Sequence, residues 1–131
     1  MATSLQRIMT SDGRFLTLLT KEGPVTAEAD NLAFNQIWDI PTLSSPYSTI
    51  QNLGYATPKP YAGLDADGIT IVGGQVPLAW NIISSGGNTF IQKVGSNLAW
   101  TIESGIGSTV ELAAQSLTDP TQQLTLVAAP A

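Results

Sequence analysis

Short apolar segments recur three times along the chain, and this period constrains the fold more than any other feature. Isoleucines begin the three equivalent segments, 42 and 41 residues apart: Ile8, Ile50 and Ile91. Two tryptophans and a leucine end them, 42 and 44 residues apart: Trp38, Trp80 and Leu124. A fixed period of this length indicates one supersecondary unit per repeat. We therefore expect three units, at about 5–43, 47–85 and 87–129, in one domain spanning 1–131.

Within each unit, residues alternate as they do in half-buried strands. The clearest stretches are Val25-Thr26-Ala27, Ile69-Thr70-Ile71 and Val110-Glu111-Leu112. Turns rich in Gly and Pro separate them, and no segment of ten or more residues has a convincing helical face. The chain is therefore predicted to be all-β. The threefold period favours a closed barrel, which leaves no open sheet edge.

Residue inventory excludes several classes of function. The 131 residues contain no His and no Cys, which removes Ser-His-Asp and Cys-His catalysis, disulfides and the usual zinc sites. The net charge of −5, with five Lys plus Arg, argues against nucleic-acid partners and anionic membranes. No apolar leader or membrane-spanning run is visible, so a cytoplasmic location is the expectation. We expect a non-enzymatic protein with no cofactor and no metal.

The ends of the units carry a family motif. Gln36-Ile37-Trp38 is a Gln-x-Trp triplet, Gln122-Gln123-Leu124 keeps its Gln, and Leu78-Ala79-Trp80 keeps its Trp. The chain thus resembles the ricin-B-like family, and from about Trp38 to Val127 it is similar to small cysteine-free fungal lectins. The resemblance implies a β-trefoil of twelve short strands that binds glycans or glycoproteins.

Matching positions to the similar lectins places a glycan against the loop and strand that lead into the second-unit Trp. The implied site residues are Leu64, Asp65, Ala66, Gly73, Pro77, Leu78, Ala79 and Trp80. Leu64 and Leu78 stand where aromatic residues are expected, and nearby Tyr61 is a substitute for them. Trp80 has an alternative role in the core, and Asp65 with Asp67 can instead form a solvated turn.

A second candidate for sugar binding is Asp12 in Asp12-Gly13-Arg14-Phe15, which resembles the Asp-bearing turn of ricin-type lectins. A carboxylate that accepts two hydroxyl hydrogen bonds is suitable chemistry for a sugar. Asp-Gly is also a common turn, so a purely structural role stays open.

The resemblance leaves two alternative functions, because fungal protease inhibitors and the lectin-like subunit of some tyrosinases share the scaffold. For an inhibitor, the proline-flanked Lys59 is the candidate contact, with Lys21 and Arg14 as rival loop cations and plain surface loops as the alternative. Trp100 breaks the threefold pattern, since the same offset from the marker isoleucine holds Thr17 and Lys59. It is either core or surface.

Overall fold

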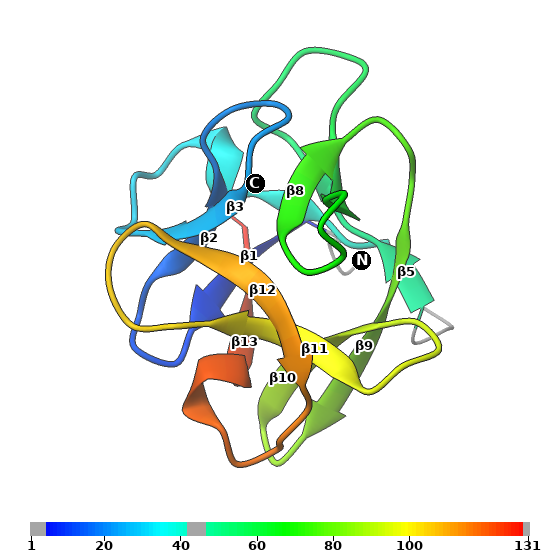
Figure 1. Cartoon of the computed structure of the whole chain (residues 1–131). Coiled ribbons are helices and arrows are strands. Elements are labelled where there is room, and N and C mark those ends of the chain that lie inside the picture. The colour runs from blue at the N-terminus through cyan, green and yellow to red at the C-terminus, as the bar shows by residue number, and fades with distance from the viewer. Residues whose placement is uncertain (1–4, 42–46, 130–131) are drawn as a thin grey trace.

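The computed structural model describes residues 5–41 and 47–129, which contain strands and two single-turn 3-10 helices but no α-helix (Figure 1). The all-β prediction is confirmed. The predicted first-unit end at residue 43 lies outside the described residues. No helix in the described ranges is long and apolar enough to cross a membrane.

Seven strands form a closed barrel: β1 (Leu5–Thr10), β4 (Trp38–Asp39), β5 (Tyr47–Thr49), β6 (Gln51–Asn52), β9 (Ala79–Ser85), β10 (Asn88–Lys93) and β13 (Leu124–Ala128). Antiparallel pairing runs from β13 to β1, β4 and β6, and from β5 to β9, β10 and back to β13. Closure leaves no free edge for pairing with another chain.

Six further strands form three hairpins: β2 (Phe15–Leu18) with β3 (Val25–Glu28), β7 (Tyr61–Leu64) with β8 (Ile71–Gly74), and β11 (Leu98–Ile102) with β12 (Ser108–Ala114). The hairpins touch one another in turn, through the pairs Ser108↔Ala27, Pro24↔Val72 and Thr70↔Glu111. In Figure 1 the strands β3, β8 and β12 surround the middle of the view.

The strand that opens the second unit is divided, which makes the count of twelve strands wrong. The described residues hold thirteen strands, because β5 and β6 lie on either side of Ile50 and pair with different neighbours. Ile50 itself is fully buried. Its side chain therefore fills the barrel where the ladder changes partner.

One apolar core lies inside the barrel and beneath the hairpins. The six residues that marked the ends of the predicted units are at most 1% exposed: Ile8, Ile50, Ile91, Trp38, Trp80 and Leu124. Trp80 and Trp100 meet edge to face with ring centroids 5.3 Å apart and an angle of 81°. Such a pair adds about 0.5–1.5 kcal/mol beyond area burial.

A buried glutamine ties each of two closing segments to its hairpin, and we call this contact the Gln–Thr latch. The helix η1 (Phe34–Gln36) ends in Gln36, whose Nε2 donates to Thr17 Oγ1 at 3.0 Å and to the Ala29 carbonyl at 2.8 Å. Its Oε1 accepts from the Asn31 N–H at 3.1 Å. All hydrogen-bonding groups of a buried amide need such partners.

The same latch recurs after η2 (Pro120–Gln122). Gln122 Nε2 donates to Thr101 Oγ1 at 3.0 Å and to the Ala114 carbonyl at 2.9 Å, and its Oε1 accepts from the Ser116 N–H at 2.7 Å. Thr101 therefore corresponds to Thr17.

Trp100 consequently corresponds to Leu16 and not to Thr17, so the offset counted from the isoleucines is wrong by one position in the first unit. In the second unit it is wrong by three positions, since the equivalent residue is Ala62 and not Lys59. The indoles of Trp38 and Trp80 donate to the carbonyls of Leu16 and Ala62, at 3.0 and 2.9 Å, which makes these two residues equivalent as well. All three equivalent residues are buried. Trp100 is thus a core residue, because its position in the hairpin points inward in every unit.

The first and second units are in tight backbone contact at Gly73 of β8. Its N–H donates to the Gly23 carbonyl at 2.9 Å, and a Cβ at this position would lie 2.2 Å from the Lys21 carbonyl oxygen. The next residue, Gly74, faces open space. Of these two residues, Gly73 is the one at which a backbone contact requires glycine.

We expect Gly73→Ala to lower the free energy of unfolding by about 1–3 kcal/mol, because the added methyl group must push the Lys21 backbone away. Gly74→Ala is the matched control and should be neutral or slightly stabilising. Urea denaturation of both variants measures the difference. Equal stability of the two variants would contradict the close packing of these units.

Candidate functional site

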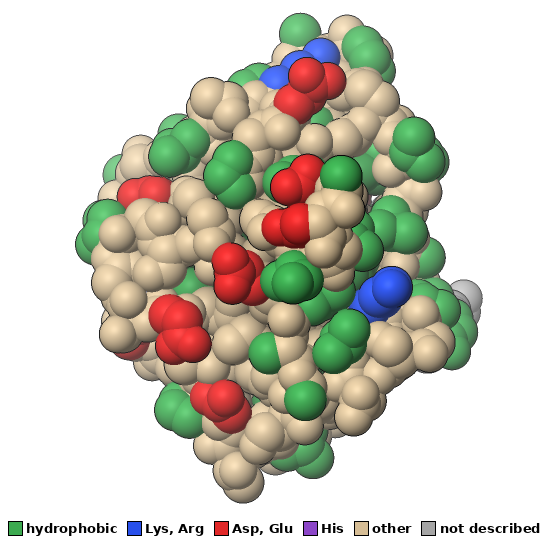
Figure 2. All heavy atoms as spheres, in the orientation of Figure 1, with side chains coloured by type: hydrophobic (Ala, Val, Ile, Leu, Met, Phe, Trp, Pro, Cys, Tyr) green, Lys and Arg blue, Asp and Glu red, His purple; other side chains and the backbone are tan. Residues whose placement is uncertain are grey.

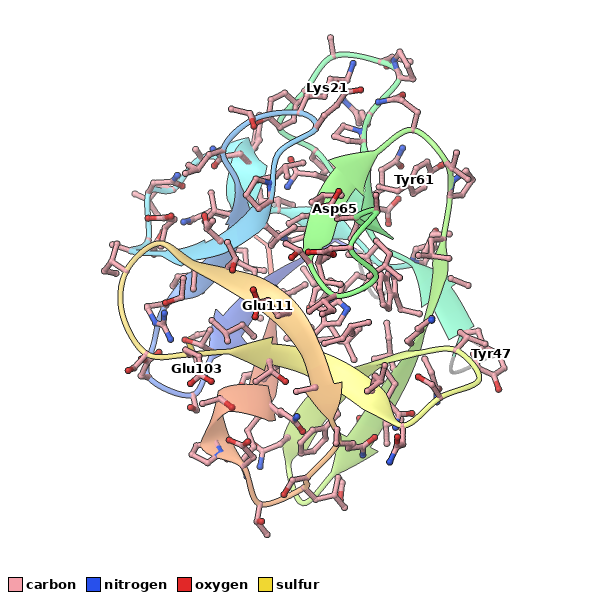
Figure 3. All side chains as sticks on the ribbon, in the orientation of Figure 1. Lys21, Tyr47, Tyr61, Asp65, Glu103 and Glu111 are labelled. Carbon is pink, nitrogen blue, oxygen red and sulfur yellow. The ribbon has the colours of Figure 1, made fainter. Side chains whose placement is uncertain are left out.

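The hairpin of β7 and β8 borders a surface hollow of about 400 Å³, which we call the second-hairpin hollow. It is lined by Gly63, Leu64, Asp65, Ala66, Val72, Gly73, Gly74, Gln75, Val76 and Leu78. Val76 is 77% and Leu78 37% exposed, so apolar side chains face solvent here. Figure 3 shows Asp65 at this hairpin, near the middle of the view. The hollow therefore combines apolar walls with a carboxylate.

The hollow lies where the other two units have the Gln–Thr latch. Gly63 follows Ala62 as Thr17 follows Leu16, and Leu78 precedes Trp80 by two residues as Gln36 precedes Trp38. Neither replacement can form the latch, since glycine has no side chain and leucine has no polar group. Gln36 is 1% exposed, against 37% for Leu78. The equivalent hollow beside the latched third hairpin, lined by Thr101 and Glu103 among others, has about 270 Å³. Loss of the latch thus enlarges the hollow and exposes apolar side chains in it.

Two carboxylates in the β7–β8 turn have different roles. Asp67 accepts from the N–H groups of Thr70 and Ile69 at 2.9 and 2.8 Å and from Thr70 Oγ1 at 2.7 Å, and these bonds lower the pKa of Asp67. The exposed Asp65 carboxylate makes no hydrogen bond or ion pair with the described residues. Asp67 closes the turn, and Asp65 is left to accept hydrogen bonds from a ligand.

The predicted site residues separate into two adjoining hollows. Leu64, Asp65, Ala66, Gly73 and Leu78 line the second-hairpin hollow. A neighbouring hollow of about 550 Å³, the proline-loop hollow, is lined by Gln51, Thr57, Pro58, Lys59, Tyr61, Gln75 and Pro77. Tyr61 and Pro77 are the predicted sugar-site residues among them. Ala79 is exposed at the start of β9 but lines neither of these hollows.

Trp80 is not available for stacking on a sugar, which corrects its predicted role as a contact residue. It has no exposed surface, its ring is in edge-to-face contact with Trp100, and its indole N–H donates to the Ala62 carbonyl. Replacing such a tryptophan by alanine costs about 3–5 kcal/mol, so loss of binding in that variant would report loss of folding. Trp80 can only support the hollow from beneath.

Sequence patterns missed Gly63, Gln75 and Val76. Gly63 could have been found by comparing the second hairpin with the Thr positions of the others. Gln75 joins three surfaces, because it lines both hollows above and a third of about 740 Å³, the basic hollow, formed by Thr20, Lys21, Glu22, Gly23, Pro58 and Gln75. No periodicity or motif marks Gln75, since its importance comes from the meeting of separate loops.

The candidate inhibitory residue Lys59 lies against its own loop. Its Nζ donates to the Tyr55 carbonyl at 2.9 Å, its carbonyl accepts from Gln51 Nε2 at 3.2 Å, and the residue is half-buried. An inhibitor contact would need this side chain to project from the surface. The inhibitor function with Lys59 or Lys21 stays a prediction.

Asp12 pairs with Arg14, which links the first and third units, and we call this set of contacts the Asp12–Arg14 clamp. Its carboxylate accepts from Arg14 Nε at 2.9 Å and from Thr10 Oγ1 at 2.5 Å, and these two hydrogen bonds hold the pKa of Asp12 below its ordinary value. The Arg14 guanidinium is buried and also donates to the carbonyls of Gly105 and Glu103. Arg14 is therefore a structural residue and not an exposed loop cation.

The described residues bring no three His, Cys, Asp or Glu side chains close enough to hold a metal ion. No protein-family model matches the chain, and no curated protein matches its sequence.

Solved structures, in contrast, share its fold. One is a ricin B-like lectin from Macrolepiota procera in complex with lactose, with a TM-score of 0.81, 16% identity, and coverage of 98% of this chain and 97% of the lectin. A second is the designed threefold symmetric protein ThreeFoil, with a TM-score of 0.82, 15% identity, and coverage of 95% and 98%. At these identities the similarity concerns the fold.

An enzyme also contains this fold as one part. An endo-β-galactosidase from Clostridium perfringens that releases GlcNAcα1-4Gal has a TM-score of 0.77 and 20% identity to this chain. The match covers 94% of this chain but only 32% of the enzyme.

We expect Asp12→Asn to reduce stability at neutral pH, because the charged partner of Arg14 is lost. A carboxyl group whose pKa is depressed by folding stabilises the protein above its unfolded pKa, and this contribution is lost as the pH falls through the folded value. The gap between wild type and variant should therefore close as the pH falls below the ordinary value of 3.8. Thermal unfolding across pH measures it.

Asp65→Asn is the control for this experiment, since its carboxylate has no partner among the described residues. It should leave the unfolding curves almost unchanged. A pH-independent gap for Asp12→Asn would contradict the charge-based role of the clamp.

Proposed function

We propose that this protein is a non-enzymatic, lectin-like β-trefoil that binds glycans in the second-hairpin hollow. One observation carries the proposal: the hollow is larger where the Gln–Thr latch is missing than beside the latched third hairpin, and it places the unshared Asp65 carboxylate beside exposed apolar side chains. The recurring latch, the three hairpins and the closed barrel support the three-unit trefoil.

The chemistry of the hollow suits a pyranose ring. Sugars present hydroxyl donors at the ring edge and C–H groups on one face, and a shallow site can use both. Asp65 would accept one or two hydroxyl hydrogen bonds, which are stronger than neutral ones because the acceptor is charged. Leu64, Val76 and Leu78 would cover the C–H face. The hollow has no aromatic residue in its lining, so binding at one site should be weak.

The comparisons support this class of ligand without identifying it. The similar lectin is described with bound lactose, and the similar enzyme acts on a galactose-containing glycan. The matched region is one third of that enzyme. Hydrolysis of a glycosidic bond needs two carboxyl groups on opposite sides of the bond, whereas the lining of the second-hairpin hollow holds one, Asp65. Recognition of a glycan, without its cleavage, is the function that we propose.

Asp65→Ala should weaken glycan binding about tenfold or more, since a hydrogen bond to a charged group contributes about 1.5–3 kcal/mol. The matched control is Glu103→Ala, because Glu103 follows Thr101 by two residues as Asp65 follows Gly63. A glycan array screens for the ligand, and titration calorimetry with the best neutral glycan gives the dissociation constants.

A second variant restores the latch in the second unit. The double change Gly63→Thr with Leu78→Gln should narrow the hollow toward the size of the one beside the third hairpin, about 270 Å³, and weaken binding. A melting curve checks that the variant remains folded. If the wild-type protein binds no glycan on the array, the proposal is overturned. It is also overturned if Asp65→Ala and the double variant bind as tightly as wild type.

A further inference from the structure

Basic residues are rare in this chain, and two of the five gather on one part of its surface. Arg7 and Arg14 are each in an ion pair, with Asp30 at 2.8 Å and with Asp12 at 2.9 Å. Lys21 lines the basic hollow and Lys59 lines the adjoining proline-loop hollow. Figure 2 shows basic side chains at the upper end of a face on which acidic side chains predominate, with an acidic side chain directly beside them and a further basic side chain lower on the right.

Specific contacts hold the two lysine-bearing loops together. Tyr55 OH donates to the Leu18 carbonyl at 2.5 Å, which ties the loop of Lys59 to the end of β2, just before Lys21. Burial raises the pKa of Tyr55, so its hydroxyl remains a donor at neutral pH. Pro58 lines both hollows. The proximity of the lysines is thus built into the packing.

The basic hollow is also continuous with the proposed sugar site. Gln75 lines all three hollows, and the Lys21 backbone packs directly on Gly73, a lining residue of the second-hairpin hollow. In Figure 3, Asp65, Tyr61 and Lys21 lie between the centre of the view and its upper end. A surface of this extent suits an oligosaccharide better than a single sugar.

We propose that the basic hollow is a subsite for an anionic group, a sugar carboxylate or a sulfate ester, on a glycan whose neutral part occupies the second-hairpin hollow. This inference rests on the proposed function. Lys59 Nζ gives one N–H to Tyr55 and keeps two for a ligand, whereas Lys21 has no side-chain bond to the described residues. An ammonium group binds either anion as a point charge.

Glu22 limits how much negative charge the subsite can accept. It lines the basic hollow beside Lys21, and the protein as a whole carries a net charge of −5. A polyanion or an anionic membrane would meet like charge around the two lysines, whereas one anionic substituent meets only its immediate neighbours. The subsite should therefore select a glycan with a single anion at this position.

The test compares matched probes on the wild-type protein: lactose, 3′-sialyllactose and 3′-sulfolactose, together with neutral, sialylated and sulfated pairs on a glycan array. At least one acidic member should bind about fivefold more tightly than its neutral partner, since an exposed ion pair contributes up to about 1 kcal/mol. The advantage should shrink as salt is added. The acid that shows it, carboxylate or sulfate, identifies the source of the anion.

Lys21→Gln and the double variant Lys21→Gln/Lys59→Gln should lose the advantage for the acidic glycan and keep binding of the neutral one. Lys93→Gln is the control, because Lys93 ends β10 and lines none of the three hollows. The Lys21 side chain makes no hydrogen bond or ion pair with the described residues, so Lys21→Gln remains informative if the double variant is unstable.

The outcomes separate the two proposals. Binding of neutral glycans without preference for an acidic partner overturns the anionic subsite and leaves the proposed function standing. If Lys93→Gln and Lys21→Gln both abolish the preference for the acidic glycan, the subsite is also overturned, since the preference would then come from the overall charge of the protein. Absence of any glycan binding overturns both.

Discussion

The hydrogen bonds of a buried glutamine amide set the shape of this protein's surface. Gln36 and Gln122 each satisfy their amide through a threonine hydroxyl, a backbone carbonyl and a backbone N–H. Leaving such a group unpaired costs about 1–3 kcal/mol, so the segment before the closing strand must stay against its hairpin. Where the latch is present in the third unit, the hollow beside the hairpin is smaller, at about 270 Å³ against about 400 Å³ in the second unit.

The second unit holds its hairpin by other means, which frees the surface for a ligand. Trp80 donates to the Ala62 carbonyl from below, Gly73 packs on the backbone of Lys21, and Tyr55 joins the neighbouring loops. These contacts use backbone groups and core atoms and do not occupy the position of the latch. The hairpin is therefore held by backbone groups and core atoms, and the Asp65, Val76 and Leu78 side chains stay exposed to a ligand.

The sequence predicted the strand content, the isoleucines as equivalent starts of the three units and the departure of Leu78 from the motif, because each depends on residues within one unit. The offset of Trp100 was wrong because the loop between the marker isoleucine and the hairpin varies in length between units. Trp80 was placed at the site from a resemblance, whereas its burial depends on packing against Trp100. The meeting of Lys21 and Lys59 could not be predicted, since they belong to different units.

The three units have unequal cores, and this inequality reaches the surface. The inward-facing position of the hairpin holds Leu16, Ala62 or Trp100. The position that ends each unit holds Trp38, Trp80 or Leu124. The third unit thus carries its indole in the hairpin, where the Trp100 N–H has no partner among the described residues.

The edge-to-face contact between Trp80 and Trp100 offsets part of the free-energy cost of the unpaired Trp100 N–H. This contact also fixes Trp80 beneath Ala62, which is followed directly by Gly63 in the wall of the second-hairpin hollow. An asymmetric pair of core tryptophans therefore supports the one hairpin that has lost its latch. The core of the third unit, through Trp100, therefore supports the surface of the second unit at Gly63.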